Sequence, residues 1–214
     1  MNASAPRQRL APDERRRRIL DAAVEVFAER GYQGASMEEI AGRAGVVASV
    51  IYDHFTSKRN LYVELLELHG EALIERSVSR IQESEPRERL LRGIEAFFEF
   101  VEEDPFVWRF LFRDPPAVPE ITDVHREIRD RATEEIASVL ESQATPQVTA
   151  ELPIPRKRAA RMLAEAVRAA TDGLAAWWYE NRETPREHVV AIAMSLLWNG
   201  FGGLVGAQPR PKDV

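Results

Sequence analysis

Three hydrogen-bond donors recur at short spacing in the first third of the chain: Tyr52, His54 and Lys58. Each can donate to a phosphate oxygen, and phosphates receive a large share of the hydrogen bonds that proteins make to DNA. Ala48 and Ser49 come just before them and are small enough to let the end of a helix approach the edges of bases. These residue types, in this order, indicate a surface that binds nucleic acid.

The surrounding sequence predicts two short helices joined by a tight turn. Ser36 followed by Glu39 is a capping-box pattern, which begins a helix. Gly45 ends that helix, because glycine adopts a left-handed backbone conformation at little cost. A second helix begins near Val47, and its buried side is formed by Ile51 and Phe55. This is the pattern of a helix-turn-helix, whose second helix enters the major groove, although glycine-interrupted helix pairs also arise by chance.

The sequence of residues 45–62 resembles that of a known family. They read GVVASVIYDHFTSKRNLY and fit the pattern GVxxxxIYxHFxSKxxLY. The pattern resembles the DNA-binding signature of TetR-type (tetracycline-repressor-like) transcriptional regulators. The resemblance includes the preceding helix at 15–30, with Gly31 and Tyr32 after it, and so covers about residues 1–65.

The resemblance implies a role for each position of the motif. Ser36 would cap the first helix of the pair, and Ile51 and Phe55 would lie in the core. The residues facing DNA would be Val47, Ala48, Ser49, Val50, Tyr52 and Asp53, and those on the DNA backbone would be Tyr52, His54 and Lys58.

Three positions depart from the commoner family pattern. Val47 stands where Ser or Thr often caps the second helix, so the start of that helix is less well satisfied. Val50 stands where Thr is usual and can touch a thymine methyl group but cannot donate to a phosphate. Asp53 brings a negative charge close to DNA, which costs affinity unless it accepts from a cytosine amino group or pairs with an arginine. These departures concern the target sequence more than the class of protein.

Charge is distributed unevenly along the chain. The net charge of −6 argues against a nucleic-acid partner. Residues 1–60 nevertheless carry 10 Lys and Arg against 8 Asp and Glu, whereas residues 61–214 carry 19 against 27. The cations gather beside the motif, in the arginine run 15–18 and at Arg7 and Arg9, which lie on an arm that can follow phosphates. The alternative for the run is a solvated helix start.

Length and composition are compatible with a cytoplasmic protein. The 214 residues can form one domain or a small head with a larger body. The chain has no Cys, which excludes disulfides and thiolate metal sites and suits a reducing compartment. No secretory signal is expected, because the basic start leads into an amphipathic helix with Asp21, Glu25 and Glu29 on its polar side.

Helical patterns continue beyond residue 57, and no alternation typical of strands occurs. Pro86, Pro105 and Pro119 each open a helix, where the missing N–H costs nothing. The expected helices are 57–84, 86–104, 105–114, 119–142, 156–181 and 185–201, with a loop at 143–155. We therefore predict an all-α fold with an N-terminal three-helix helix-turn-helix head and a larger helical ligand-binding and dimerisation body. The predicted divisions are a basic arm at 1–12, the head at 13–60, the body at 61–208 and a tail at 209–214.

The last two expected helices have the composition of an oligomer interface. Helix 156–181 is rich in alanine, which lets a partner helix approach closely, and helix 185–201 is apolar on all sides. They resemble the pair with which TetR-like proteins build a two-fold four-helix dimer. The expected interface residues are Ala169, Val189, Ala193, Leu196 and Leu197.

A membrane anchor is the alternative for this end of the chain. Residues 189–209 are 21 positions without a charge, long enough to span a bilayer, and Arg210 and Lys212 follow them. Ser195, Asn199 and the glycines of 200–206 would, however, make a poor lipid-facing helix. We therefore predict no membrane partner.

Aromatic residues concentrate in residues 97–112. Some of them must face a cavity, an interface or solvent, because Phe97, Phe98 and Phe100 cannot share one side of a helix. The resemblance implies a cavity that binds a small molecule and moves the DNA-binding heads. The expected ligand-binding residues are Phe97, Phe100, Trp108 and Leu111. Few ionisable groups lie among these apolar faces, so we expect an apolar or amphipathic ligand. Arg109, Arg113 or His125 could hold a carboxylate or simply face solvent.

Together these features predict a ligand-responsive DNA-binding transcriptional regulator, specifically a repressor released by an apolar or amphipathic small molecule. Its partners would be a double-stranded inverted-repeat operator, a second copy of the chain and an unidentified small ligand. We expect no enzymatic activity, cofactor or metal, since the four His lack ligand spacing and no phosphate-binding or nucleophile motif occurs. The alternative is an all-helical ligand-binding or scaffold protein without sequence-specific DNA binding, which Val47, Val50 and Asp53 would suit.

Overall fold

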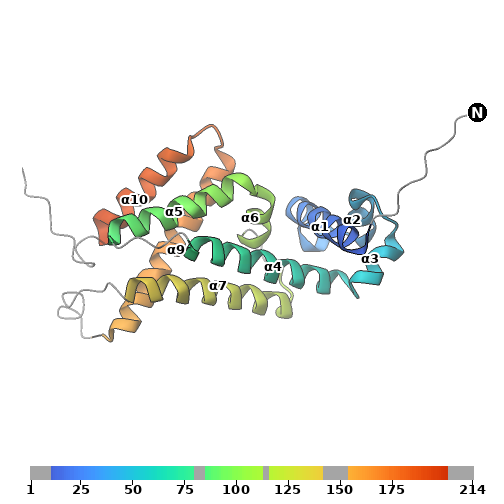
Figure 1. Ribbon diagram of the computed structural model, residues 1–214, viewed down its shortest axis with the longest axis horizontal. Helices are drawn as coiled ribbons and strands as arrows, with labels where there is room; N and C mark the ends of the chain where they lie inside the picture. Colours follow the sequence, from blue (N-terminus) through green and yellow to red (C-terminus); the bar gives the residue numbers. More distant parts are fainter. Residues whose placement is uncertain (1–10, 80–84, 113–115, 142–153, 202–214) are drawn as a thin grey trace, which may run out of the picture.

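The computed structural model describes residues 11–79, 85–112, 116–141 and 154–201, and its regular secondary structure over these residues is α-helical (Figure 1). The predicted all-α class is confirmed. The head comprises α1 (Pro12–Gly34), α2 (Met37–Ala44) and α3 (Ala48–His54). The body comprises α4 (Lys58–Ser79), α5 (Pro86–Glu103), α6 (Pro105–Phe112), α7 (Pro119–Glu141), α9 (Arg156–Glu180) and α10 (Arg186–Phe201).

The ends of the head helices follow from particular residues. Pro12 occupies the first turn of α1, where its missing N–H costs nothing. Gly31 has a φ of 68° and kinks α1, so the helix continues to Gly34 in a new direction instead of ending near residue 30 as predicted. Ser36 Oγ accepts a hydrogen bond from the Glu39 backbone N at 3.1 Å, which confirms the predicted cap of α2. Gly45 has a φ of 70° and ends α2.

The head has a compact apolar core. Ile19 on α1, Ile40 on α2, Ile51 on α3 and Phe55 after it are all fully buried. These residues belong to one cluster that continues through α4 and α6 into the body. The head and the body therefore share a continuous apolar core.

In the body, α4 lies between the other helices. It begins beside α3 and runs lengthwise past α6, α5 and α7 (Figure 1). α7 packs on α4 and α9, α10 packs mainly on α5, and α6 packs on α1 of the head. The predicted boundary at residue 60 therefore falls in the first turn of α4, and one unbroken helix joins the two predicted parts.

Several predicted segments lie wholly or partly outside the described residues. They are the arm at 1–12, the loop at 143–155 and the tail at 209–214, with Arg7, Arg9, Arg210 and Lys212. Within the part of the chain that the structure describes, no helix is both long and apolar enough to cross a membrane.

Candidate functional site

The outer face of α3 carries the residues predicted to contact DNA. Val47 is 66% exposed and Tyr52 is 51% exposed, whereas Ile51 is fully buried. Ser49 and Asp53 are exposed as well, and Ala48, Val50 and His54 are half-buried. The periodicity of the helix thus places Tyr52 and Asp53 outward and Ile51 inward, whereas Ala48 and Val50 pack partly against the core.

The start of α3 lacks a side-chain cap, as the presence of Val47 predicted. Val47 gives this helix no side-chain cap, and Val50 N donates to the Val47 carbonyl at 2.9 Å. Val47 therefore contributes apolar surface to the exposed face and no hydrogen bond to the helix start.

Lys58 has a structural role that the sequence did not predict. Its Nζ donates to the backbone carbonyls of Tyr32, at 2.8 Å, and Ala35, at 2.9 Å, and lies 4.7 Å from the centre of the Tyr32 ring. The first residue of α4 is thereby bound to the end of α1. An ammonium group has three N–H donors, so one remains for a phosphate, and the predicted contact with the DNA backbone stays a prediction.

Three of the four arginines at the start of α1 pair with acidic side chains. Arg16 pairs with Glu64 on α4 and lies over the Phe55 ring. Arg17 and Arg18 both pair with Glu14. Arg17 and Arg18 are largely exposed, so their pairs contribute little stability and phosphates can compete for them.

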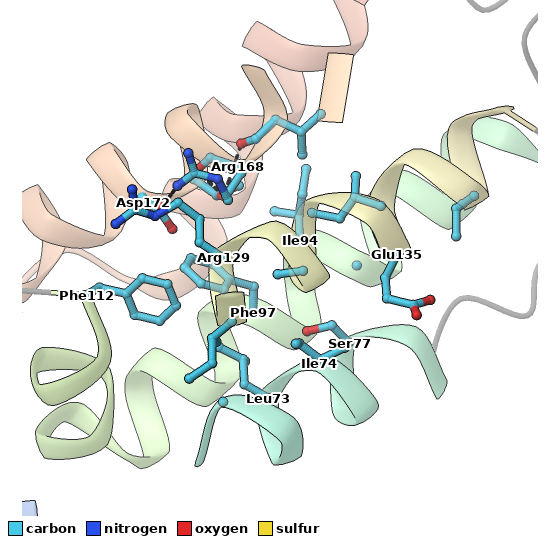
Figure 2. A pocket seen from close by; sticks show the side chains of 18 of the residues that line it. Leu73, Ile74, Ser77, Ile94, Phe97, Phe112, Arg129, Glu135, Arg168 and Asp172 are labelled. Carbon is cyan, nitrogen blue, oxygen red and sulfur yellow. Dashed lines mark hydrogen bonds and ion pairs between the residues drawn. The ribbon is translucent and has the colours of Figure 1, made fainter. Parts of the chain in front are cut away.

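A cavity of about 240 Å³ lies between the helices of the body. Its walls come from α4, α5, α6, α7 and α9, and apolar side chains from several of these helices line it, among them Leu73, Ile74, Ile94 and Phe97 (Figure 2). Arg129, Arg168 and Asp172 stand on one side of this apolar stretch, and Ser77 and Glu135 on the other (Figure 2). The cavity can therefore enclose a molecule with an apolar centre.

Two of the four predicted ligand residues line this cavity. Phe97 and Leu111 lie in its wall, but Phe100 and Trp108 do not. Phe100 is 6% exposed, and Trp108 is 1% exposed and stacks on Tyr179 with ring centres 5.2 Å apart. Aromatic content did not distinguish these buried residues from Phe106 and Phe112, which are 40% and 37% exposed, and did not indicate which neighbour each side of α5 and α6 would face.

The prediction missed the walls contributed by α4 and α7. On α4 the cavity is lined by Gly70, Leu73, Ile74 and Ser77. On α7 an apolar stripe at Ile128, Ala132, Ile136 and Val139 faces it. The spacing of three or four residues along α7 was a signal in the sequence that could have identified this wall.

A charged cluster forms one edge of the cavity. Arg168 binds Glu165 at 2.7 Å and Asp172 at 2.8 Å, and Thr133 donates to Glu165 at 3.1 Å. Burial raises the pKa of the Asp172 carboxyl to about 6, although the Arg168 charge acts in the opposite direction. Acidic partners thus already surround Arg168.

His125 lies in the cavity wall as a neutral side chain. Burial lowers the pKa of its imidazole to about 4, and the charge of Arg129 lowers it further. It does not supply a positive charge for a carboxylate near neutral pH, which was one of its predicted roles. Of the other two candidates, Arg109 lies over the Tyr179 ring and outside the cavity wall, and Arg113 is outside the described residues.

An aromatic cluster connects the cavity wall with the head. The Tyr62 ring on α4 lies 6.2 Å from the His125 ring, 4.9 Å from Phe27 and 5.1 Å from Tyr32, measured between ring centres. Phe110 on α6 completes it at 4.7 Å from Tyr62. The cluster joins α1, α4, α6 and α7, and it includes Tyr32, whose backbone carbonyl accepts a hydrogen bond from Lys58.

The outer face of α9 and α10 is apolar and differs from the predicted interface. Its large exposed side chains are Met162, Trp177, Ile192 and Leu196, each between 51% and 59% exposed. Among the predicted residues, Ala169 and Leu196 lie on this face. The other three, Val189, Ala193 and Leu197, point into the protomer and are at most 3% exposed, because positions four apart on α10 share the side that packs on α5.

Two known protein families match successive parts of the chain. Residues 19–65 match the family described as bacterial regulatory proteins, tetR family, and residues 86–200 match the tetracyclin repressor-like C-terminal domain. The HTH-type transcriptional activator FasR of Mycolicibacterium smegmatis is 32% identical over 196 residues, which cover 90% of this chain and 85% of FasR. The chain belongs to the TetR family. It is a DNA-binding transcriptional regulator of that family, as the motif at 45–62 predicted.

Other relatives resemble the regulator over part of its length or in fold. The HTH-type transcriptional repressor KstR of Rhodococcus jostii is 30% identical over 119 residues, covering 53% of this chain and 56% of KstR. A TetR-like regulator from Rhodococcus sp. RHA1 superposes with a TM-score of 0.74 at 27% identity, over 91% of this chain and 100% of that one. FadR of Bacillus subtilis, solved in complex with stearoyl-CoA, superposes with a TM-score of 0.70 at 23% identity, over 91% and 100%.

Proposed function

We propose that this regulator binds an inverted-repeat operator as a two-fold dimer and that a small molecule in the body cavity lowers its affinity for DNA. The observation that carries the proposal is the course of α4. The helix begins in the head at Lys58, which binds α1, and lines the cavity from Gly70 to Ser77. A ligand that binds more tightly to one position of α4 shifts the head toward that position.

The cavity favours an amphipathic ligand with an apolar part of some length. Its lining runs along α7 from His125 to Leu140, a distance of about 22 Å at the rise of an α-helix. Most of the side chains along that run are apolar, and Arg129 and Glu135 stand among them. The stearoyl-CoA bound to FadR of Bacillus subtilis is a molecule of this general shape, which supports an acyl chain or similar group as the ligand.

The exposed apolar face of α9 and α10 supports the dimer. Met162, Trp177, Ile192 and Leu196 lie on the two helices that belong to the tetracyclin repressor-like domain. An exposed apolar patch of this kind marks an interaction surface, and a two-fold copy of the same face would cover it. The two α3 helices should then reach major grooves about 34–36 Å apart or a multiple of that distance.

A gel-shift assay tests the proposal with the DNA that flanks the chain's own coding sequence. Binding should survive excess competitor DNA and should weaken roughly 5–150-fold when a ligand occupies the cavity. Loss of binding to competitor would favour the alternative of a helical ligand-binding or scaffold protein without sequence-specific DNA binding. A ligand that fills the cavity but leaves operator affinity unchanged would contradict the switch.

The sign of regulation needs a separate experiment. The sequence-based prediction was a repressor, yet the relative that matches most of the chain is named an activator, and KstR is named a repressor. A reporter gene behind the operator, with and without the regulator, distinguishes the two. Expression that rises when the regulator is deleted would support a repressor, and expression that falls would contradict it.

A further inference from the structure

Asp53 faces directly away from the core of the head. Ile51 on the same helix is fully buried, and each residue of an α-helix is rotated by about 100° from the one before it. Asp53, two residues later, therefore projects from the opposite side of α3, and its side chain is exposed. Ser49, one turn earlier, shares that side and is exposed as well. The carboxylate of Asp53 thus stands on the side of the recognition helix that meets the major groove.

The position of Asp53 within α3 is unfavourable for the free protein. Asp53 is the last residue but one of the helix, which ends at His54. The carboxyl end of a helix carries a partial negative charge, so a carboxylate in the last turn is repelled by the helix dipole. The local structure therefore gives no reason for an acid here, and contact with DNA accounts for it better.

The basic side chains between residues 16 and 59 have partners other than Asp53. Each of them lies within ion-pair or hydrogen-bond distance of another group: Arg16 of Glu64, Arg17 and Arg18 of Glu14, Arg30 of Glu39, Arg43 of Glu29, Lys58 of two backbone carbonyls and Arg59 of Glu120. The sequence left two partners open for Asp53, an arginine or a cytosine. These contacts favour the second, because the carboxylate reaches DNA with its charge unneutralised by these cations.

We propose that Asp53 accepts a hydrogen bond from the N4 amino group of a cytosine in each half-site of the operator and thereby selects that base. The inference rests on the proposed function, because it specifies the operator proposed there. In the major groove guanine and thymine present acceptors, which repel a carboxylate, and only cytosine and adenine present an amino group. The adenine amino group lies between two acceptors, its own N7 and O4 of the paired thymine, whereas that of cytosine has an acceptor on one side only. A carboxylate therefore prefers cytosine to adenine.

Selection from a pool of double-stranded DNA with a randomised centre gives the base preference at every position of the operator. The wild type should select a cytosine at one position of each half-site. Asp53→Ala should lose that preference alone, and Asp53→Asn should change it to adenine, whose N6 and N7 match a side-chain amide. Glu38→Gln removes an exposed acid from the first turn of α2 and is the matched control for the loss of charge. This variant should keep the cytosine.

The selection separates failure of the inference from failure of the proposed function. If the wild type and both Asp53 variants select the same inverted repeat, the inference is overturned while operator binding stands. A uniform gain in affinity for Asp53→Ala, with every base preference kept, would also overturn it, because Asp53 would then only repel phosphates. If the wild type selects no motif, specific operator binding fails and the inference fails with it.

A change in the DNA tests the amino group itself. Deoxyzebularine is deoxycytidine without the N4 amino group, and it replaces the selected cytosine in a gel-shift probe. Binding of the wild type should weaken roughly tenfold, whereas binding of Asp53→Ala should hardly change. Equal losses for the two proteins would place the effect in the DNA duplex and overturn the hydrogen bond. Asp53→Ala should melt no lower than the wild type, because it removes a charge that opposes the helix dipole, so unfolding does not confuse the comparison.

Discussion

Among single residues, Lys58 combines a structural contact with an expected DNA contact. Lys58→Ala leaves the carbonyls of Tyr32 and Ala35 without their donor, which should destabilise the folded state by about 1–3 kcal/mol and weaken binding to all DNA sequences alike. Tyr52→Phe removes only an exposed hydroxyl, so it should weaken binding without lowering the melting temperature. Thermal unfolding and gel shifts on both variants separate the two effects. An unchanged melting temperature for Lys58→Ala, or an altered base preference, would contradict this assignment.

His125 should make stability depend on pH. The pKa of its imidazole falls from 6.5 to about 4 on folding, chiefly because of burial. As pH drops below 6.5, His125 becomes protonated in the unfolded chain, whereas in the folded protein it stays neutral until about pH 4. The free energy of unfolding therefore falls by up to about 3 kcal/mol over this interval. Above pH 6.5 the side chain has no such effect.

Comparison with His125→Phe isolates this contribution. Burial raises the pKa of Asp172 to about 6, so Asp172 acts in the opposite direction and stabilises the folded state as pH falls through 6. That contribution is present in both proteins. Urea unfolding between pH 7 and 4 should show the wild type losing stability relative to the variant. Parallel pH profiles would mean that His125 is not buried as a neutral side chain.

At the scale of helices, the crossing of α4 and α7 depends on Gly70. A Cβ built at this position would lie 2.8 Å from Cγ2 of Ile128, closer than real contacts permit. Gly70→Ala should therefore destabilise the protein by about 1–3 kcal/mol, although alanine is the better helix former. Gly42→Ala on α2 has open space around its Cβ and should be neutral or stabilising by up to about 1 kcal/mol.

A double-mutant cycle tests the contact directly. If the clash with Ile128 causes the destabilisation, Gly70→Ala should cost less in an Ile128→Ala background than in the wild type. Urea unfolding of the four proteins gives the coupling free energy. Additive costs would show that the strain lies elsewhere in the crossing.

The elements were easier to predict than the faces they present. Pro86, Pro105 and Pro119 marked helix starts because the absence of an N–H is a local property of the chain. Ser36 and Gly45 marked the ends of α2 for the same kind of reason. Trp108 was expected to line the ligand cavity and Leu197 to lie in the dimer interface, yet both are buried elsewhere within the protomer. Which helix each side chain faces depends on packing between distant segments, and periodicity carries no information on that.

The same distinction explains what the sequence missed in the candidate site. The exposure of Tyr52 and Asp53 on α3 follows from the helix period, whereas the half-burial of Ala48 and Val50 depends on packing within the head. The partners of Lys58 are backbone carbonyls, which every residue has. No pattern of side chains in the sequence could therefore predict these two hydrogen bonds. The neutral state of His125 arises from its burial in the folded body, and it cannot be read from the scattered positions of four histidines.

At the scale of the whole molecule, the neighbouring leucines of α10 distinguish assembly from folding. Leu196 is 58% exposed on the outer face, and Leu197 is 2% exposed inside the protomer. Leu196→Asp should leave the protomer folded but place an unpaired charge in the proposed interface, which would break the dimer and weaken operator binding. Leu197→Asp should instead unfold the protomer, because burying an unpaired charge costs several kcal/mol.

Leu68→Asp provides the control for this comparison. Leu68 is 48% exposed on α4, away from the α9 and α10 face, so the same substitution there should preserve both fold and assembly. For Leu196→Asp, Leu197→Asp and Leu68→Asp, sedimentation velocity measures the mass of the assembly and circular dichroism measures the helical content. A two-fold operator needs both heads at a fixed spacing, so the loss of dimer in Leu196→Asp should appear together with the loss of operator binding. Monomeric wild-type protein, or dimeric Leu196→Asp, would contradict the proposed interface.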